Sequence, residues 1–139
     1  MSKKQMDERI GIENYSLFSK GTLINYKLIF NNPKCVFSKE GYASVEPDID
    51  SVVEGIIYEI NNIGLEKLDV FELVFDKEYK REQISVDSEK GKIICEVYIA
   101  TNTQDDLKPS KAYIEKLLVG RSYLSPGYIK MLESVETID

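Results

Sequence analysis

The sequence predicts an α+β domain with a largely antiparallel or mixed sheet, because strand patterns come first and helix signals cluster late in the chain. Alternating apolar side chains indicate the strands, and Ser110 and Ser125 each precede a helical pattern. The 139 residues leave room for one hydrophobic core, so this interpretation treats residues 1–139 as a single domain.

The first part of the chain predicts a helix followed by strands. Residues 2–11 are charged and end in glycine, which is typical of a short surface helix with little to bury. Residues 21–31 alternate apolar and polar side chains, which indicates a half-buried strand. Residues 35–37 and 42–45 are expected to be short extended pieces, with a turn starting at Pro47.

The middle of the chain predicts a covered strand, a helix and a hairpin. Both alternating sets of side chains in residues 51–60 are largely apolar, which predicts a central strand covered on both faces. Apolar residues recur at helical spacing over residues 64–71. Residues 79–86 and 92–101 read as two paired strands, and the second has one fully apolar face.

Two helices near the end of the chain have clear start signals. Ser110 can cap a helix that stops at Gly120. Ser125 followed by Pro126 gives the start of the last helix. Each segment carries an apolar stripe, as an amphipathic helix does.

Charge and hydropathy exclude several classes of protein. The 18 basic and 24 acidic residues give a formal charge of -6, so no broad basic face is available for nucleic acid or an anionic membrane. No uncharged stretch approaches the roughly 18 to 20 residues that cross a bilayer, and no apolar run follows the basic N-terminus as it would in a signal peptide. We expect a cytoplasmic protein without nucleic-acid or membrane partners, and the oligomeric state stays open.

The absence of histidine removes much catalytic chemistry. Without an imidazole, any catalysis must use carboxylate, Tyr, Lys, Cys or backbone groups. Cys35 and Cys95 lie far apart and have no Cys or His at metal-ligand spacing, so the sequence predicts no metal site. We interpret both cysteines as buried, reduced side chains.

Glu72 has the most unusual neighbourhood of the acidic residues, because the apolar run of residues 70–75 surrounds it. If it faces a cleft, desolvation raises the pKa of its carboxyl toward neutrality, where one group can act as a base and then as an acid. The alternative interpretation is a helix end at which Glu72 points to water while its neighbours point inward.

Three further residues are candidates for a ligand site. Gly55 interrupts an otherwise apolar strand, where glycine often marks a bulge or the close approach of a backbone or ligand. Tyr79 and Tyr113 can donate hydrogen bonds to a small polar ligand. Alternatively, both tyrosines are half-buried core residues with their hydroxyls at the surface.

The order of these motifs resembles the gamma-glutamylcyclotransferase family over nearly the whole chain. The stretches that carry the resemblance are residues 21–23, 26–31, 43–48, 53–60, 68–72, 79, 109–113, 120–121, 124–126 and 128–132. The resemblance implies a mixed, mostly antiparallel sheet that curls into a small barrel, flanked by about four short helices.

The same resemblance implies an activity and a site. The family converts a γ-glutamyl amine or peptide to 5-oxoproline and a free amine, a lyase or acyltransferase reaction without metal or organic cofactor. Glu72 matches the family's catalytic glutamate, and a carboxylate is among the groups that the composition leaves available. Tyr79 and Tyr113 would line the pocket for a small γ-glutamyl compound, and Gly55 would keep the neighbouring strand close.

Two features depart from the family pattern. Leu73 follows Glu72 where the family usually has glycine. The family's first strand and its Tyr-Gly-Ser-Asn loop, whose backbone groups hold the glutamyl arm, would lie immediately before Met1. Either such residues precede Met1, or this is a shortened form with an empty strand position, unpaired strand edges and weak turnover.

Two other functions are consistent with the same residues. The chain can be a non-catalytic small-ligand-binding or interaction domain of this fold, inactive because the glutamyl-binding loop is missing. A purely structural role is the third interpretation, and it predicts that side chains fill the region around Glu72. The sequence carries no code for the identity of the amine leaving group.

Overall fold

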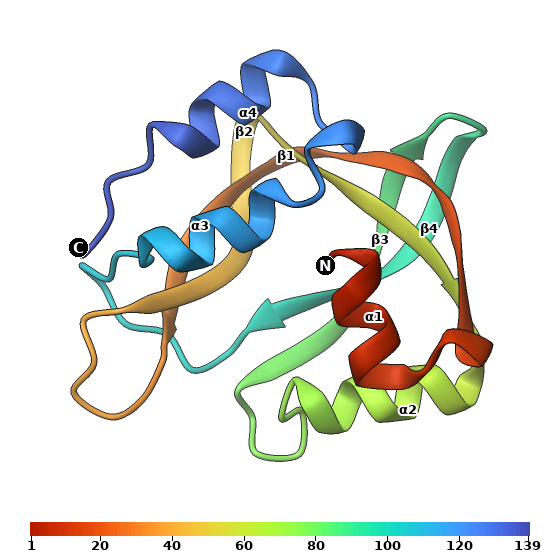
Figure 1. Cartoon of the computed structure of the whole chain (residues 1–139), viewed down its shortest axis with the longest axis horizontal. Coiled ribbons are helices and arrows are strands. Elements are labelled where there is room, and N and C mark those ends of the chain that lie inside the picture. Colours follow the sequence, from red (N-terminus) through yellow and green to blue (C-terminus); the bar gives the residue numbers. More distant parts are fainter.

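Two long strands, β1 and β2, form one half of the fold, and a shorter hairpin of β3 and β4 forms the other (Figure 1). The computed structural model describes all residues from Met1 to Asp139. In chain order the elements are α1 (Lys3–Ile10), the 3-10 helix η1 (Ile12–Asn14), β1 (Tyr15–Pro33), β2 (Gly41–Ile60), α2 (Asn62–Phe71), β3 (Tyr79–Ser88), β4 (Gly91–Ala100), α3 (Lys111–Leu118), the 3-10 helix η2 (Arg121–Tyr123) and α4 (Pro126–Glu133). The structure confirms the predicted α+β class and its four short helices.

The sheet has the strand order β2-β1-β3-β4, and every neighbouring pair is antiparallel. A single parallel bridge lies outside the named strands. β1 pairs with β2 along most of its length but meets β3 only at Gly21 and Thr22. The sheet does not close, because β2 and β4 are its edges and no ladder joins them. The mostly antiparallel sheet is therefore confirmed, and its closure into a barrel is wrong.

The strand β2 differs from the sequence prediction in two respects. It runs without interruption, so the predicted turn at Pro47 is wrong. Pro47 lies opposite Tyr26 beside a shift in register, and Asp50 has a φ of 67°, so the strand bends there without ending. Residues 51–60 do not form a central strand, because β2 is an edge strand. One part of this segment faces α3 and α4, and another lines a cavity beside β4.

The connection between β1 and β2 is a turn, so the extended piece predicted for residues 35–37 is wrong. Phe37 has a φ of 66°, and its side chain is 96% exposed. Cys35 at the same hairpin tip is exposed, whereas Cys95 on β4 is half-buried. The expectation of two buried cysteines fails at Cys35, because the tip projects beyond the elements that would cover it.

The helices α1 and α2 share the main cluster of buried side chains. Ser2 caps α1 by accepting a hydrogen bond from the Gln5 N–H, while the Gln5 side chain accepts one from the Ser2 N–H. Met6 and Ile10 of α1 pack against Leu68 of α2, with exposures of 0%, 1% and 2%. The expectation that the first helix has little to bury is wrong. Its two apolar side chains, Met6 and Ile10, are among the most buried in the chain.

The remaining elements follow their sequence signals. Ser110 and Ser125 accept hydrogen bonds from the third residue of α3 and α4 respectively, and Pro126 opens α4. The predicted hairpin of β3 and β4 is present with a regular antiparallel register. Figure 1 shows α3 and α4 beside the β1–β2 pair and α1 lying against α2. The longest helix has ten residues, and none is long and apolar enough to cross a membrane.

The buried contact between α1 and α2 gives a stability prediction. We expect Met6→Ala to lower the free energy of unfolding by about 2 to 5 kcal/mol, because it opens a cavity at a fully buried site. Met131→Ala is the matched control, since Met131 is 39% exposed on α4, and we expect a change below about 0.5 kcal/mol. Urea unfolding followed by circular dichroism measures both, and equal effects would contradict the buried role of Met6.

Candidate active site

Glu72 lies directly after α2, at the start of the loop that leads to β3. Asn61 begins the helix by accepting a hydrogen bond from the Gly64 N–H, and the Glu72 N–H donates to the Leu68 carbonyl at 2.8 Å. Leu73 then has a φ of 53°, in the left-handed region that glycine adopts without cost. The backbone therefore makes the turn that glycine would allow, although a leucine stands at this position.

The Glu72 side chain points away from open solvent. It is 18% exposed, and one carboxylate oxygen accepts a hydrogen bond from Nη1 of Arg9 at 3.3 Å. Burial raises the pKa of the Glu72 carboxyl, while the positive charges of Arg9 and of the Met1 amino group oppose that rise. The alternative in which Glu72 projects into water is therefore wrong. The carboxyl is desolvated and close to a cation.

Arg9 is the functional candidate that sequence reasoning missed. It lies in the last turn of α1, and its guanidinium packs over the Phe71 ring at 4.1 Å from the ring centre. The same Nη1 that binds Glu72 also donates to the sulfur of Met1 at 2.9 Å. The sequence signal that could have indicated Arg9 is its position beside Ile10, one of only two apolar residues in α1. The charged composition of residues 2–11 suggested instead that the whole segment is solvated.

Tyr79 and Tyr113 come from different elements and meet at one peptide segment of β2. The Tyr79 hydroxyl donates to the Ala43 carbonyl at 2.9 Å, and the Tyr113 hydroxyl accepts from the Ala43 N–H at 3.2 Å. Burial is the main cause that raises the pKa of both hydroxyls, and the charge of Glu72 contributes to both shifts. Both tyrosines therefore stay protonated near neutrality. The Tyr113 hydrogen, which its bond to Ala43 does not use, is free for another acceptor.

Gly55 has a different environment from the one predicted. It pairs with Gly21 across the β1–β2 ladder, and a Cβ built on Gly55 would meet no atom within 4 Å. No neighbouring backbone therefore depends on glycine at this position, so the expected close approach is wrong. Gly21 is the position with that constraint, because a Cβ there would lie 2.6 Å from the Ile57 side chain. Gly55 instead lines two cavities.

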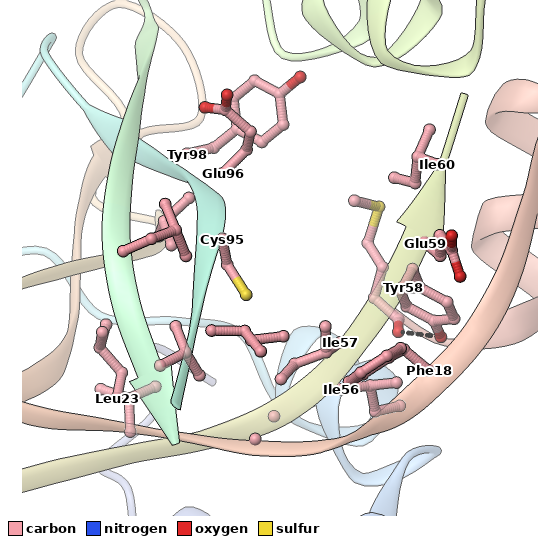
Figure 2. Close-up of a pocket in the computed structure, with 18 of the residues that line it drawn as sticks. Phe18, Leu23, Ile56, Ile57, Tyr58, Glu59, Ile60, Cys95, Glu96 and Tyr98 are labelled. Carbon is pink, nitrogen blue, oxygen red and sulfur yellow. Dashed lines mark hydrogen bonds between the residues drawn. The ribbon is translucent and has the colours of Figure 1, made fainter. Parts of the chain in front are cut away.

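The larger of these cavities, of about 640 Å³, lies between the edge strands β2 and β4 (Figure 2). Its lining is mostly apolar and includes Ile57 and Ile60 from β2 and Cys95 from β4. Met1 forms part of the wall, where its carbonyl accepts a hydrogen bond from the Tyr58 hydroxyl at 2.8 Å. Glu72 does not line this cavity. It is connected to the wall through Arg9, which contacts both Glu72 and Met1.

The two strand edges approach each other at one end of the cavity. There the Ala100 N–H donates to the Ser44 hydroxyl at 2.8 Å, which ties the end of β4 to β2. Beyond that contact no ladder of hydrogen bonds joins β2 and β4, and the apolar cavity lies between their edges. No group of three or more His, Cys, Asp or Glu side chains is arranged to hold a metal ion.

Comparison with known proteins first gives the class. A family model described as the AIG2-like family matches residues 52–132, which is more than half of the chain and includes Glu72, Tyr79 and Tyr113. A solved structure named Gamma-glutamyl cyclotransferase superposes with a TM-score of 0.86 at 24% identity, over 98% of this chain and 82% of that one. An uncharacterized protein from Homo sapiens gives a TM-score of 0.85 at 25% identity, with the same coverage.

A curated relative then identifies the family. The protein named Gamma-glutamylcyclotransferase from Bos taurus is 30% identical over 142 residues, covering 96% of this chain and 75% of that protein. The chain belongs to the gamma-glutamylcyclotransferase family, as the order of its motifs predicts. The solved structures support the same fold.

The contacts at Ala43 give a second stability prediction. Tyr79→Phe and Tyr113→Phe each remove one partner of the Ala43 peptide groups, so we expect each to lower the free energy of unfolding by about 1 kcal/mol. Tyr26→Phe on β1 is the control, because the half-buried Tyr26 makes no contact of this kind, and its effect should stay below about 0.5 kcal/mol. Losses in the two variants no larger than in Tyr26→Phe, measured by urea unfolding, would mean that the hydroxyls do not hold β2.

Proposed function

We propose that this chain cyclises a γ-glutamyl amine or peptide to 5-oxoproline and releases the free amine, with Glu72 as the general acid and base. The observation that carries the proposal is the state of Glu72. Its carboxylate is shielded from water, its pKa is raised by burial, and it lies next to a guanidinium. A carboxyl whose pKa is raised above its ordinary value is better suited to take up and then return a proton than a solvated one. The named activity of the Bos taurus relative supports the same reaction class.

The reaction needs one proton to move between two nitrogen atoms. The α-amino nitrogen of the substrate attacks its own γ-carbonyl carbon and forms the ring C–N bond, while the C–N bond to the leaving amine breaks. Glu72 accepts the proton that the attacking nitrogen loses and donates it to the departing nitrogen, so the carboxylate is restored. No water is consumed, and the pocket's task is to hold the glutamyl arm in a folded, near-attack shape.

Tyr79 and Tyr113 are proposed to line the glutamyl pocket. Their hydroxyls lie together at Ala43, and the charge of Glu72 acts on both. Tyr113 has a hydrogen free to donate to a carbonyl oxygen that gains negative charge during attack. Gly55 is proposed to leave space for ligand in the apolar cavity that it lines, since the volume above it is open. The small γ-glutamyl compound is the only partner in this proposal, and the cytoplasm is the expected compartment.

A non-catalytic binding domain of the same fold is the second candidate. The observation that favours it is the main cavity, because it is lined mostly by apolar side chains and does not include Glu72. In that case the chain binds γ-glutamyl compounds saturably and forms no product. Calorimetric titration combined with product analysis separates the two functions, and both should be run on this chain and on any longer product of its gene.

Glu72→Gln is the direct test of the acid and base. The amide keeps an oxygen that can accept from Arg9 but carries no exchangeable carboxyl proton, so we expect turnover to fall at least about 100-fold with the melting temperature nearly unchanged. Glu66→Gln is the matched control, because Glu66 is an exposed carboxylate on α2, the helix that Glu72 follows. Chromatography measures the release of 5-oxoproline. Undiminished turnover in Glu72→Gln would show that this residue is not the acid and base.

The pH dependence provides an independent check. A general base must be ionised in the free enzyme, and burial raises the pKa of Glu72 above its ordinary value of 4.5. Activity should therefore be lost as the pH falls through a midpoint above 4.5, earlier than for a solvated glutamate. The profile of kcat/KM against pH measures this midpoint. An acid limb at or below 4.5 would contradict a desolvated Glu72 as the base.

A further inference from the structure

Arg9 is held in the site but uses little of its hydrogen-bonding capacity. Its side chain is 22% exposed, beside a Glu72 side chain that is 18% exposed. Both of its hydrogen bonds come from Nη1, one to Glu72 and one to the weakly accepting sulfur of Met1. The donors on Nε and Nη2 are not used, so most of the guanidinium fork is free for a further acceptor.

The position of this guanidinium is fixed from two sides. The Phe71 ring lies under it, with 4.1 Å between the guanidinium carbon and the ring centre. The helix that carries Arg9 is anchored by Met6 and Ile10, the most buried side chains of the cluster with α2. A planar cation that is stacked and anchored in this way loses little freedom when it binds a planar anion, which is the condition for efficient carboxylate recognition.

Arg9 is the only cationic side chain whose charge shifts the pKa of the Glu72 carboxyl. Arg81 is paired with Asp69, and Arg121 with Glu133. Because the chain carries a formal charge of -6, an anionic substrate meets a repulsive field unless the site contains a local cation.

We propose that Arg9 binds the α-carboxylate of the substrate and thereby places the α-amino group beside Glu72. This inference rests on the proposed function, since it assigns a substrate group to that same site. The α-carboxylate and the α-amino group are attached to one carbon atom. The free N–H of Nη2 that lies on the same edge of the guanidinium as Nη1 is the relevant donor. A carboxylate bound there brings the amine close to the Glu72 oxygen that Nη1 contacts.

The same contact connects substrate binding to the proton transfer. In the free protein the positive charge of Arg9 lowers the pKa of the Glu72 carboxyl against the effect of burial. A substrate carboxylate on Arg9 neutralises part of that charge, so Glu72 becomes a stronger base when substrate is bound. Arg9 in this role is a substrate-binding residue that also adjusts the base.

The test compares two substrates that differ only in the α-carboxylate. L-γ-glutamyl-L-alanine carries it, whereas 4-aminobutyryl-L-alanine lacks it and cyclises to 2-pyrrolidinone with the same leaving group. The variants are Arg9→Met, which keeps the apolar stem without the charge, Arg9→Lys, which keeps the charge without the fork, and Arg121→Met as a control at an exposed ion pair. Release of alanine gives KM and kcat for each combination.

For Arg9→Met we expect KM for the γ-glutamyl dipeptide to rise by about 10- to 100-fold, the worth of a hydrogen-bonded charge pair. The 4-aminobutyryl dipeptide should change little, Arg9→Lys should be intermediate, and Arg121→Met should match the parent protein. An equal loss on both substrates would overturn the proposal, because it would show that Arg9 acts only by positioning Glu72 or by stabilising the fold. Thermal melting of each variant accompanies the kinetics.

A binding experiment keeps this inference separate from the proposed activity. If the parent protein turns over neither dipeptide, the proposed function fails, and Arg9 is then tested with 5-oxoproline and 2-pyrrolidinone by calorimetric titration. Binding of 5-oxoproline that is lost in Arg9→Met supports the carboxylate site without catalysis. Absence of 5-oxoproline binding to the parent protein, or equal binding to Arg9→Met, overturns it.

Discussion

The packing of α1 on α2 determines where the charged groups of the site meet. Met6 and Ile10 bury one side of α1 against Leu68, so Arg9 in the last turn is directed to the end of α2, where Glu72 caps the helix. These groups are separated by 63 positions in the sequence, and no local turn could join them. The apolar contact positions the two charged groups, and their ion pair depends on it. The electrostatics of the site therefore depend on side chains that carry no charge.

The tyrosines show the same dependence on a shared anchor. Tyr79 opens β3 and Tyr113 lies in α3, yet both hydroxyls bind the peptide groups of Ala43 on β2. Packing of the Tyr113 ring against Phe30 and Tyr42 keeps it at that place. Two hydroxyls from β3 and α3 thus bind the peptide groups of one residue of β2. Fixed polar groups of this kind support the proposed role of both tyrosines in orienting a ligand.

Local signals in the sequence were sufficient for the helices and the hairpin. The burial of Glu72 was expected from its apolar neighbours, but Val70, Phe71, Leu73 and Phe75 are themselves largely exposed. Serine caps, an apolar face on β4 and an acidic residue within an apolar run are each readable over a few residues. The failures concern contacts between distant segments. The strand β2 continues through the bend at Pro47 because β1 continues to pair with it. Arg9 lies beside Glu72 because α1 packs on α2. Neither partner is visible from the residues themselves, since charge alone cannot distinguish a solvated arginine from one that is stacked and paired.

The charges of the site agree with the chemistry that composition left available. The proposed cyclisation moves one proton between nitrogens and creates no lasting charge, so a carboxylate that changes state and returns to it is sufficient, without imidazole or metal. Such a carboxylate must be desolvated to have a raised pKa, and a desolvated anion is unstable unless a cation lies nearby. Arg9 provides that cation and donates only one hydrogen bond to Glu72. A bidentate ion pair with two hydrogen bonds would hold the carboxylate ionised and occupy the guanidinium donors. With one hydrogen bond, the carboxylate can still accept a proton, and the guanidinium keeps donors for the proposed ligand.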